Sequence, residues 1–378
     1  MNVMKKISLL FLALYFQISM YSQTPGKDSV ALRTSVFHLS FVTPVGTNGM
    51  ESWNTVNKIS VNLLAGYSGG VDGAEFSGFG SLIRTDVKGF QGAGFANAVL
   101  GKTEGAQFAG FSNVSNGALK GAQFSGFANV VADSATAFQG AGFANVVNGN
   151  LKGLQMAGFA NVTHGDLLGT QLAGFANITT GDVKGAQVSG FVNVADDVNG
   201  LQLGVINVSQ SVSGGAPVGV FSFVKNGYRA VEISGNESFY GMVSFKTGIR
   251  AFYNIISLGA SIRNDKVNWG WGYGFGTLIT TGEKTELAIE AISFHVNEEE
   301  WHTDRLNLLN RLQSTLSWKV NDHLSVFGGP SFNVMVSKAK DENGLAYSPA
   351  IVPWTVYDRI HRNTRVQMYP GFSVGVRL

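Results

Sequence analysis

Residues 121–160 read GAQFSGFANVVADSATAFQGAGFANVVNGNLKGLQMAGFA and decide the fold, because the pattern in them returns every sixteen residues. Each Gly-Phe pair has a Gln four residues before its Phe and an Asn two residues after it. Eight such copies follow one another without insertion or deletion, and only the first departs, with Glu75 and Ser81 in place of Gln and Asn. The Gly-Phe pairs begin at Gly78, Gly94, Gly110, Gly126, Gly142, Gly158, Gly174 and Gly190. A regular array of identical structural units is therefore expected.

The repeated unit is predicted to be β-structure. Sixteen residues are too few for a pair of helices, and a glycine inside a helix costs ~1 kcal/mol per copy. Because side chains alternate along a strand, Gln155, Phe159 and Asn161 are expected to share one face, together with Ala157. Stacked copies would then form ladders of Gln, Phe and Asn, in which the amides hydrogen-bond to their own kind.

The residues that flank each Gln form a second regularity. Most copies place a small residue before it and a large one after it, as in Ala106-Gln107-Phe108, whereas Phe90-Gln91-Gly92 and Phe138-Gln139-Gly140 reverse the order. A constant total volume is typical of a packed surface. We therefore expect this face to contact protein as well.

Two architectures fit a sixteen-residue β unit. In a β-solenoid each unit is one coil and contacts only its neighbours, whereas in an antiparallel barrel each unit is one strand and a turn. The turns, such as Asn148-Gly149 and Thr180-Gly181, do not alternate between short and long, which favours the solenoid. The alternative is one larger β-barrel that includes the repeats. The region 67–217 is assigned to the repeat, and slipped copies after Asn193 are interpreted as capping coils.

These residues resemble a family of surface-repeat proteins of Gram-negative bacteria with Gly-x-Gln-x-(Ala/Gly)-Gly-x-x-Asn repeats. The resemblance covers roughly residues 57–222. It implies a location in the cell envelope or at the cell surface, and it transfers no catalytic residue. Relatives in that family include lipoproteins, but this chain has no cysteine that could be acylated.

The second half, residues 218–378, has a different pattern. Four aromatic residues, Trp269, Trp271, Tyr273 and Phe275, alternate with glycines, and the last strand alternates apolar and polar residues up to Leu378. One apolar face, aromatic residues in series and a polar opposite face are typical of an antiparallel outer-membrane β-barrel of about nine strands. A soluble β-sandwich is the alternative considered. Residues 24–66 are assigned to N-terminal strands, which could close the barrel.

The N-terminal segment and the composition indicate where the protein is expected to be located. Lys5 and Lys6 precede the predominantly apolar stretch Ile7–Phe16, so residues 1–23 are predicted to be a signal peptide. Charged residues make up 14% of the chain, and 49 of the 378 residues are glycine. This composition is unusual for a soluble enzyme. The net charge of +2 provides no basic field for nucleic acid.

No known catalytic motif is present, and we assign no catalytic, cofactor-binding or metal-ligating residues. The one titratable cluster, His295, Glu298, Glu299, Glu300 and His302, is interpreted as a solvated loop. The repeated lysines, such as Lys152, are interpreted as a solvated edge. We therefore expect a non-enzymatic outer-membrane or cell-surface protein with a structural or interaction role, whose partners are the lipid bilayer and an unknown surface ligand. A passive porin-like channel and a secreted soluble binding protein are the alternatives.

Overall fold

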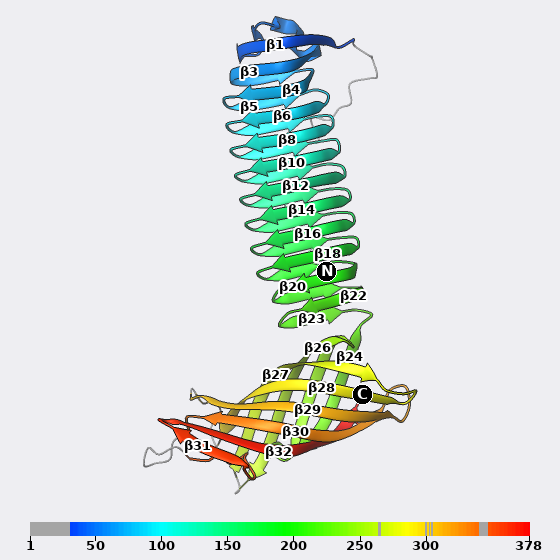
Figure 1. The fold of residues 1–378 in the computed structure, drawn as a ribbon, viewed down its shortest axis with the longest axis vertical. Coiled ribbons are helices and arrows are strands. Elements are labelled where there is room, and N and C mark those ends of the chain that lie inside the picture. Colours follow the sequence, from blue (N-terminus) through cyan, green and yellow to red (C-terminus); the bar gives the residue numbers. More distant parts are fainter. Residues whose placement is uncertain (1–30, 264–265, 299–300, 302, 304, 340–346) are drawn as a thin grey trace.

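The computed structural model describes residues 31–263, 266–298, 301, 303, 305–339 and 347–378. The chain forms a tall parallel β-solenoid followed by an antiparallel sheet of nine strands (Figure 1). The predicted signal peptide lies outside the described residues. All-β architecture and the sixteen-residue solenoid are confirmed, and the single larger barrel is wrong, because the repeat strands pair in parallel.

Each coil of the solenoid consists of one long strand, a corner, one short strand and a turn. Equivalent residues are paired one coil apart, as in Gln123 with Gln139 and Asn129 with Asn145. The long strands are β4 (Gly70–Ser77), β6 (Val87–Ala93), β8 (Thr103–Ala109), β10 (Leu119–Ser125), β12 (Ala135–Ala141), β14 (Leu151–Ala157), β16 (Leu167–Ala173), β18 (Val183–Ser189), β20 (Asp197–Leu203) and β22 (Ser211–Val218). The short strands are β5 (Gly80–Ile83), β7 (Ala96–Val99), β9 (Ser112–Ser115), β11 (Ala128–Val131), β13 (Ala144–Val147), β15 (Ala160–Thr163), β17 (Ala176–Thr179), β19 (Val192–Val194), β21 (Ile206–Ser209) and β23 (Phe221–Val224).

Both ends of the solenoid extend beyond the predicted repeat region. At the N-terminal end, β1 (Arg33–Val42) pairs in parallel with β3 (Thr55–Ser68), which itself pairs with β4 and β5. The short β2 (Val45–Gly46) and the 3-10 helix η1 (Gly49–Asn54) connect β1 to β3. These N-terminal strands belong to the solenoid and do not close the second sheet. At the other end the parallel pairing continues to Val224, because shortened turns absorb the slip in the period.

The corner of each coil corrects one expectation from the sequence. β14 ends at Ala157 and β15 begins at Ala160, so the chain bends at Gly158 and Phe159. Gln155 and Asn161 consequently lie on different strands and both are fully buried, whereas Phe159 remains 39% exposed. The Gln, Phe and Asn residues do not share one face. The corner packs closely, since a Cβ on Gly158 would lie 2.1 Å from the carbonyl oxygen of Gly142.

The antiparallel sheet, which we call the nine-stranded sheet, begins after the solenoid. Its strands are β24 (Tyr228–Asn236), β25 (Gly241–Ile249), β26 (Phe252–Arg263), β27 (Lys266–Thr280), β28 (Thr285–Glu298), β29 (Asn307–Lys319), β30 (Ser325–Ser337), β31 (Tyr357–His361) and β32 (Thr364–Arg377). Sequential strands pair from β24 to β30, and β30 then pairs with β32. The first strand, β24, pairs with β25 and also with β32. In Figure 1 strands β27–β30 and β32 run across the long axis of the solenoid, and β24–β26 run more steeply behind them.

The glycines of β27 face inward and make room for large side chains. A Cβ on Gly272 would lie 2.6 Å from the ring of Phe294, and one on Gly276 would lie 2.7 Å from Tyr253. Phe294 and Tyr253 are fully buried in the apolar cluster on this face of the sheet. The aromatic residues that alternate with these glycines, such as Trp271, point to the outside. The predicted alternation of β27 is therefore confirmed.

Candidate functional site

Two amide ladders run through the interior of the solenoid in opposite directions. Each Gln donates from Nε2 to Oε1 of the Gln one coil earlier, as from Gln155 to Gln139 at 2.8 Å. Each Asn donates from Nδ2 to Oδ1 of the Asn one coil later, as from Asn145 to Asn161 at 2.9 Å. The second Nδ2 hydrogen of Asn145 is directed at the backbone carbonyl of Met156, at 2.8 Å. The buried amides are thus almost fully satisfied, which buried polar groups require.

Glu75 terminates the Gln ladder at its N-terminal end. It occupies the ladder position in β4, where it accepts hydrogen bonds from Gln91 Nε2 at 3.3 Å and from Ser81 Oγ. Its other oxygen, Oε2, is buried and has no hydrogen-bond partner in the described part of the chain. Burial raises the pKa of the Glu75 carboxyl above its usual range, although the hydrogen bonds from Ser81 and Gln91 oppose that shift. The ladder therefore ends on a buried group that resists ionisation.

The corner Phe residues form a stacked row on the outside of the solenoid. From Phe79 to Phe191, successive ring centroids lie 4.8–5.1 Å apart. The rings are nearly parallel over most of the row, with an angle of 2° between Phe95 and Phe111. Most of these rings remain about 40% exposed. The Phe ladder was predicted, but it lies on the surface and not in the interior.

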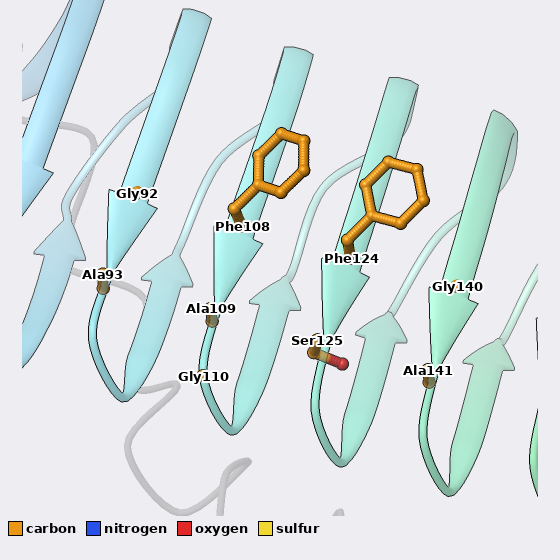
Figure 2. A pocket seen from close by; sticks show the side chains of 9 residues that line it. All are labelled: Gly92, Ala93, Phe108, Ala109, Gly110, Phe124, Ser125, Gly140 and Ala141. Atoms are coloured by element: carbon orange, nitrogen blue, oxygen red, sulfur yellow. The ribbon is translucent and has the colours of Figure 1, made fainter.

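A second apolar row lies on the outer face of the long strands. Figure 2 shows the rings of Phe108 and Phe124 between Gly92 and Gly140, and these four residues line an open depression. At Gly92 the space is taken by the ring of Phe90, whose Cε1 atom would lie 3.1 Å from an added Cβ. Phe90 stacks on Phe108 with centroids 5.6 Å apart, so the aromatic row continues across the reversed pair.

This geometry corrects the expectation that the face is covered by protein. The constant volume of each pair is explained by packing between neighbouring coils. No described part of the chain covers the row, since Phe108 is 42% exposed and Phe76 is 50% exposed. The row is therefore an exposed apolar surface, a feature that marks interaction sites in other proteins.

The face of the nine-stranded sheet opposite its exposed apolar side chains carries a network of buried ion pairs. Lys246 Nζ lies 2.6 Å from Glu232 Oε1 and also pairs with Glu290, while Arg377 Nε lies 2.6 Å from Glu232 Oε1. Tyr253 donates to Glu290 Oε1 at 2.6 Å. These side chains are almost completely buried. The network was missed from the sequence, although each member stands at a polar position of an alternating strand.

A separate cluster occupies the region near the opposite end of the sheet. Arg311 donates from Nη2 to Glu237 Oε1 at 2.9 Å and from Nε to Asn333 Oδ1 at 2.8 Å. The interpretation of the titratable cluster as a loop is wrong for His295 and Glu298, which belong to β28. His295 Nε2 lies 3.0 Å from the carbonyl oxygen of Thr303. Glu299, Glu300 and His302 lie outside the described residues.

Within the described ranges, no group of three or more His, Cys, Asp or Glu side chains is arranged to hold a metal ion. No helix in the described part of the chain is long and apolar enough to cross a membrane. Comparisons of the chain with family models, curated proteins and solved structures found no match.

Proposed function

We propose that this chain is a non-enzymatic outer-membrane protein. In this proposal the nine-stranded sheet is a membrane anchor of the outer-membrane barrel type, and the solenoid is a rigid structural or interaction module. The observation that carries the proposal is the distribution of side chains in the sheet, which is apolar outside and ionic inside.

The outward residues of the sheet are large and apolar. Leu258, Trp271, Leu312 and Phe372 are each more than half exposed and lie on four different strands. A water-soluble sheet protein rarely exposes so many large apolar side chains together. Lipid-facing strands require such a surface, and they require the polar residues to point inward.

The pairing of the first and last long strands supports closure of the sheet. Ile233 of β24 is paired with Val376 of β32, so eight strands have a partner on each side and β31 lies outside this ring. A membrane-spanning sheet must satisfy all its backbone groups internally, and closure achieves this. In an eight-stranded barrel the interior is just wide enough to be filled by side chains.

The contents of the sheet favour an anchor over a channel. Ion pairs such as Lys246 with Glu232 fill the inside, together with the apolar cluster around Phe294. The channel alternative depended on a wider barrel with the repeats in its wall, and the repeats form a separate solenoid. A structural role of the solenoid is thus the better-supported function.

Membrane assembly of a charged variant tests this proposal. Leu312 lies in the middle of β29 and is 56% exposed, so Leu312→Lys would place a charge against the acyl chains, at ~2–4 kcal/mol. Leu306→Lys makes the same change in the connection before β29 and is the matched control. We expect Leu312→Lys to reduce the salt-resistant outer-membrane fraction and the folded band in cold detergent electrophoresis, and Leu306→Lys to leave both unchanged.

Two other results would redirect the proposal. Recovery of the wild-type chain in the salt-washed soluble fraction, with equal tolerance of both variants, would indicate a secreted binding protein. Ion conductance of the purified chain in planar bilayers would indicate a channel.

A further inference from the structure

One side of the solenoid carries no charge along its whole length. We call this side the Phe edge: in each coil it comprises the two corner residues, the two outward residues before them and the two after them, such as 154, 156, 158–159, 160 and 162. The corner pair is Gly-Phe in eight coils and Gly-Val in the last two, at Gly204-Val205 and Gly219-Val220. From the coil of β4 and β5 to that of β22 and β23, all these positions lack charged residues, and the only polar ones are Ser112 and Thr170. A water-exposed surface seldom stays uncharged over ten coils.

The charged and polar residues gather at the opposite turn and the strand beginning after it. Asp182 N donates to Asp166 Oδ1 at 3.0 Å, and Asp166 N donates to Asn150 Oδ1 at 2.8 Å, so the turns form a polar ladder of their own. Lys152 and Lys184 are exposed beside these turns. The cross-section of the solenoid is therefore amphipathic, with a polar turn edge and an apolar Phe edge.

The exposed part of the Phe edge is the corner row and the outer face of the long strands. Phe159 and Met156 are about 40% exposed, whereas Ala160 and Val162 of the short strand are buried. At a coil spacing of about 4.8 Å, ten coils present on the order of several hundred Å² of exposed apolar surface, as much as the largest patches common on soluble monomers. The occupant of this surface is identified by the apolar face that it adjoins at the C-terminal end of the solenoid.

The solenoid contacts the nine-stranded sheet through side chains on the outward face of β26 and β27. Asn254 of β26 donates from Nδ2 to the carbonyl of Gly219 at 2.7 Å, and Tyr273 of β27 donates to the same carbonyl at 3.0 Å. Phe252 and Phe275, whose rings stack on the same wall, are next to this junction in sequence. The apolar edge of the solenoid therefore continues into the outward apolar face of the sheet.

The junction also indicates the side of the membrane. It lies near the end of the sheet with the connections 250–251, 281–284 and 320–324. At the other end the connection 237–240 is also short, but the two longest separations in the sequence, from β28 to β29 and from β30 to β31, belong to that end. Outer-membrane barrels place their short turns in the periplasm and their long loops outside the cell. In Figure 1 strands β27–β30 and β32 run across the solenoid axis and β24–β26 are inclined to it, so a solenoid attached here extends more along the membrane than away from it.

We propose that the solenoid lies along the periplasmic leaflet of the outer membrane, with its Phe edge inserted among the lipid acyl chains and its turn edge in water. This proposal rests on the proposed function, since the sheet must first span the membrane. Like an interfacial amphipathic helix, the rod binds lipid through one apolar side.

The chain contains no cysteine, so single cysteines can be introduced into the full protein and labelled with an environment-sensitive fluorophore. Phe143→Cys reports the Phe edge, Asn148→Cys reports the turn edge of the same coil, and Leu312→Cys reports the outward face of the sheet. Phe127→Cys repeats the Phe-edge measurement one coil away, and circular dichroism verifies that each variant is folded. Each protein is reconstituted into phosphatidylethanolamine and phosphatidylglycerol vesicles, with brominated lipid or aqueous iodide as quencher.

We expect brominated lipid to quench the labels at residues 143, 127 and 312 several-fold more strongly than the label at 148, and iodide to show the reverse order. Iodide quenching at 143, 127 and 148 with lipid quenching at 312 would overturn this inference and leave the membrane anchor standing. Iodide quenching at 312 would overturn the anchor itself. Labels at 143 and 127 that neither quencher reaches would show that a second copy covers the edge, which also overturns lipid insertion.

Discussion

Replacing one Asn in the interior ladder is expected to weaken the solenoid locally. Asn145→Leu removes the two ladder bonds, from Asn129 Nδ2 to Asn145 Oδ1 and from Asn145 Nδ2 to Asn161 Oδ1, each 2.9 Å long. It also removes the bond from Asn145 Nδ2 to the backbone carbonyl of Met156. All three Asn side chains are fully buried, so no water replaces the lost partner. Each ladder amide left without this partner costs ~1–3 kcal/mol, about 2–6 kcal/mol for the two ladder amides. Burial of the new Leu recovers ~1.5–3 kcal/mol, so a net loss of about 1–3 kcal/mol is expected.

The assay must be local, because a repeat array does not unfold in a single step. Hydrogen exchange measured by mass spectrometry on the detergent-solubilised chain reports each coil separately. A loss of about 1–3 kcal/mol corresponds to roughly 5- to 150-fold faster exchange in β11, β13 and β15. Asn148→Leu, the same change at the turn edge, should leave these strands protected. Equal protection in the two variants would refute the amide ladder as a source of stability.

Three further changes test other features of the solenoid. Glu75→Gln should raise the denaturation midpoint at pH 8 and flatten its pH dependence. The pKa of Glu75 is raised in the folded state, so the stability of the wild-type chain falls as the pH rises from the ordinary Glu pKa to the folded-state pKa. Parallel pH profiles of the two proteins would contradict this. Gly158→Ala should lower the free energy of unfolding by at least ~1–3 kcal/mol in denaturant titrations, because the new Cβ meets the carbonyl of Gly142. Gly80→Ala is the control that should be tolerated, since the nearest atom to its Cβ lies at 3.3 Å. Deletion of residues 121–136 should remove one coil and preserve the register of the others. Electron microscopy or scattering should then find a solenoid shortened by about 5 Å with the nine-stranded sheet still assembled. An unfolded solenoid would contradict the coil-by-coil description.

The sequence predicted the repeat architecture because the information is periodic. Identical residues sixteen positions apart require identical environments, and a parallel stack provides them for Gln123 and Gln139. The alternation along β27 and β32 likewise predicted which residues of the second sheet face outward. These features depend only on the spacing of residue types along the chain, which the sequence gives directly.

The depression beside Phe108 and the continuous aromatic row could not be read from the sequence alone. The reversed order in Phe90-Gln91-Gly92 did indicate a limit on side-chain volume. The space beside Gly92 is filled by the ring of Phe90, which belongs to the same aromatic row. A linear pattern reports how much volume a site holds, but not which neighbour occupies it. The exposed state of the row therefore emerged only from the packed coils.

The sequence by itself determined a β repeat with a sixteen-residue period and a second, alternating antiparallel region. The tertiary structure decided where each coil bends, and at this bend the corner Phe alone leaves the set of residues that alternation along the chain places on one face. Because the chain turns at Gly158 and Phe159, Gln155 and Asn161 face the interior from different strands while the ring lies outside. The tertiary structure also brought Lys246, Glu232 and Glu290 together from three strands, since contacts between distant segments depend on pairing register and not on spacing along the chain.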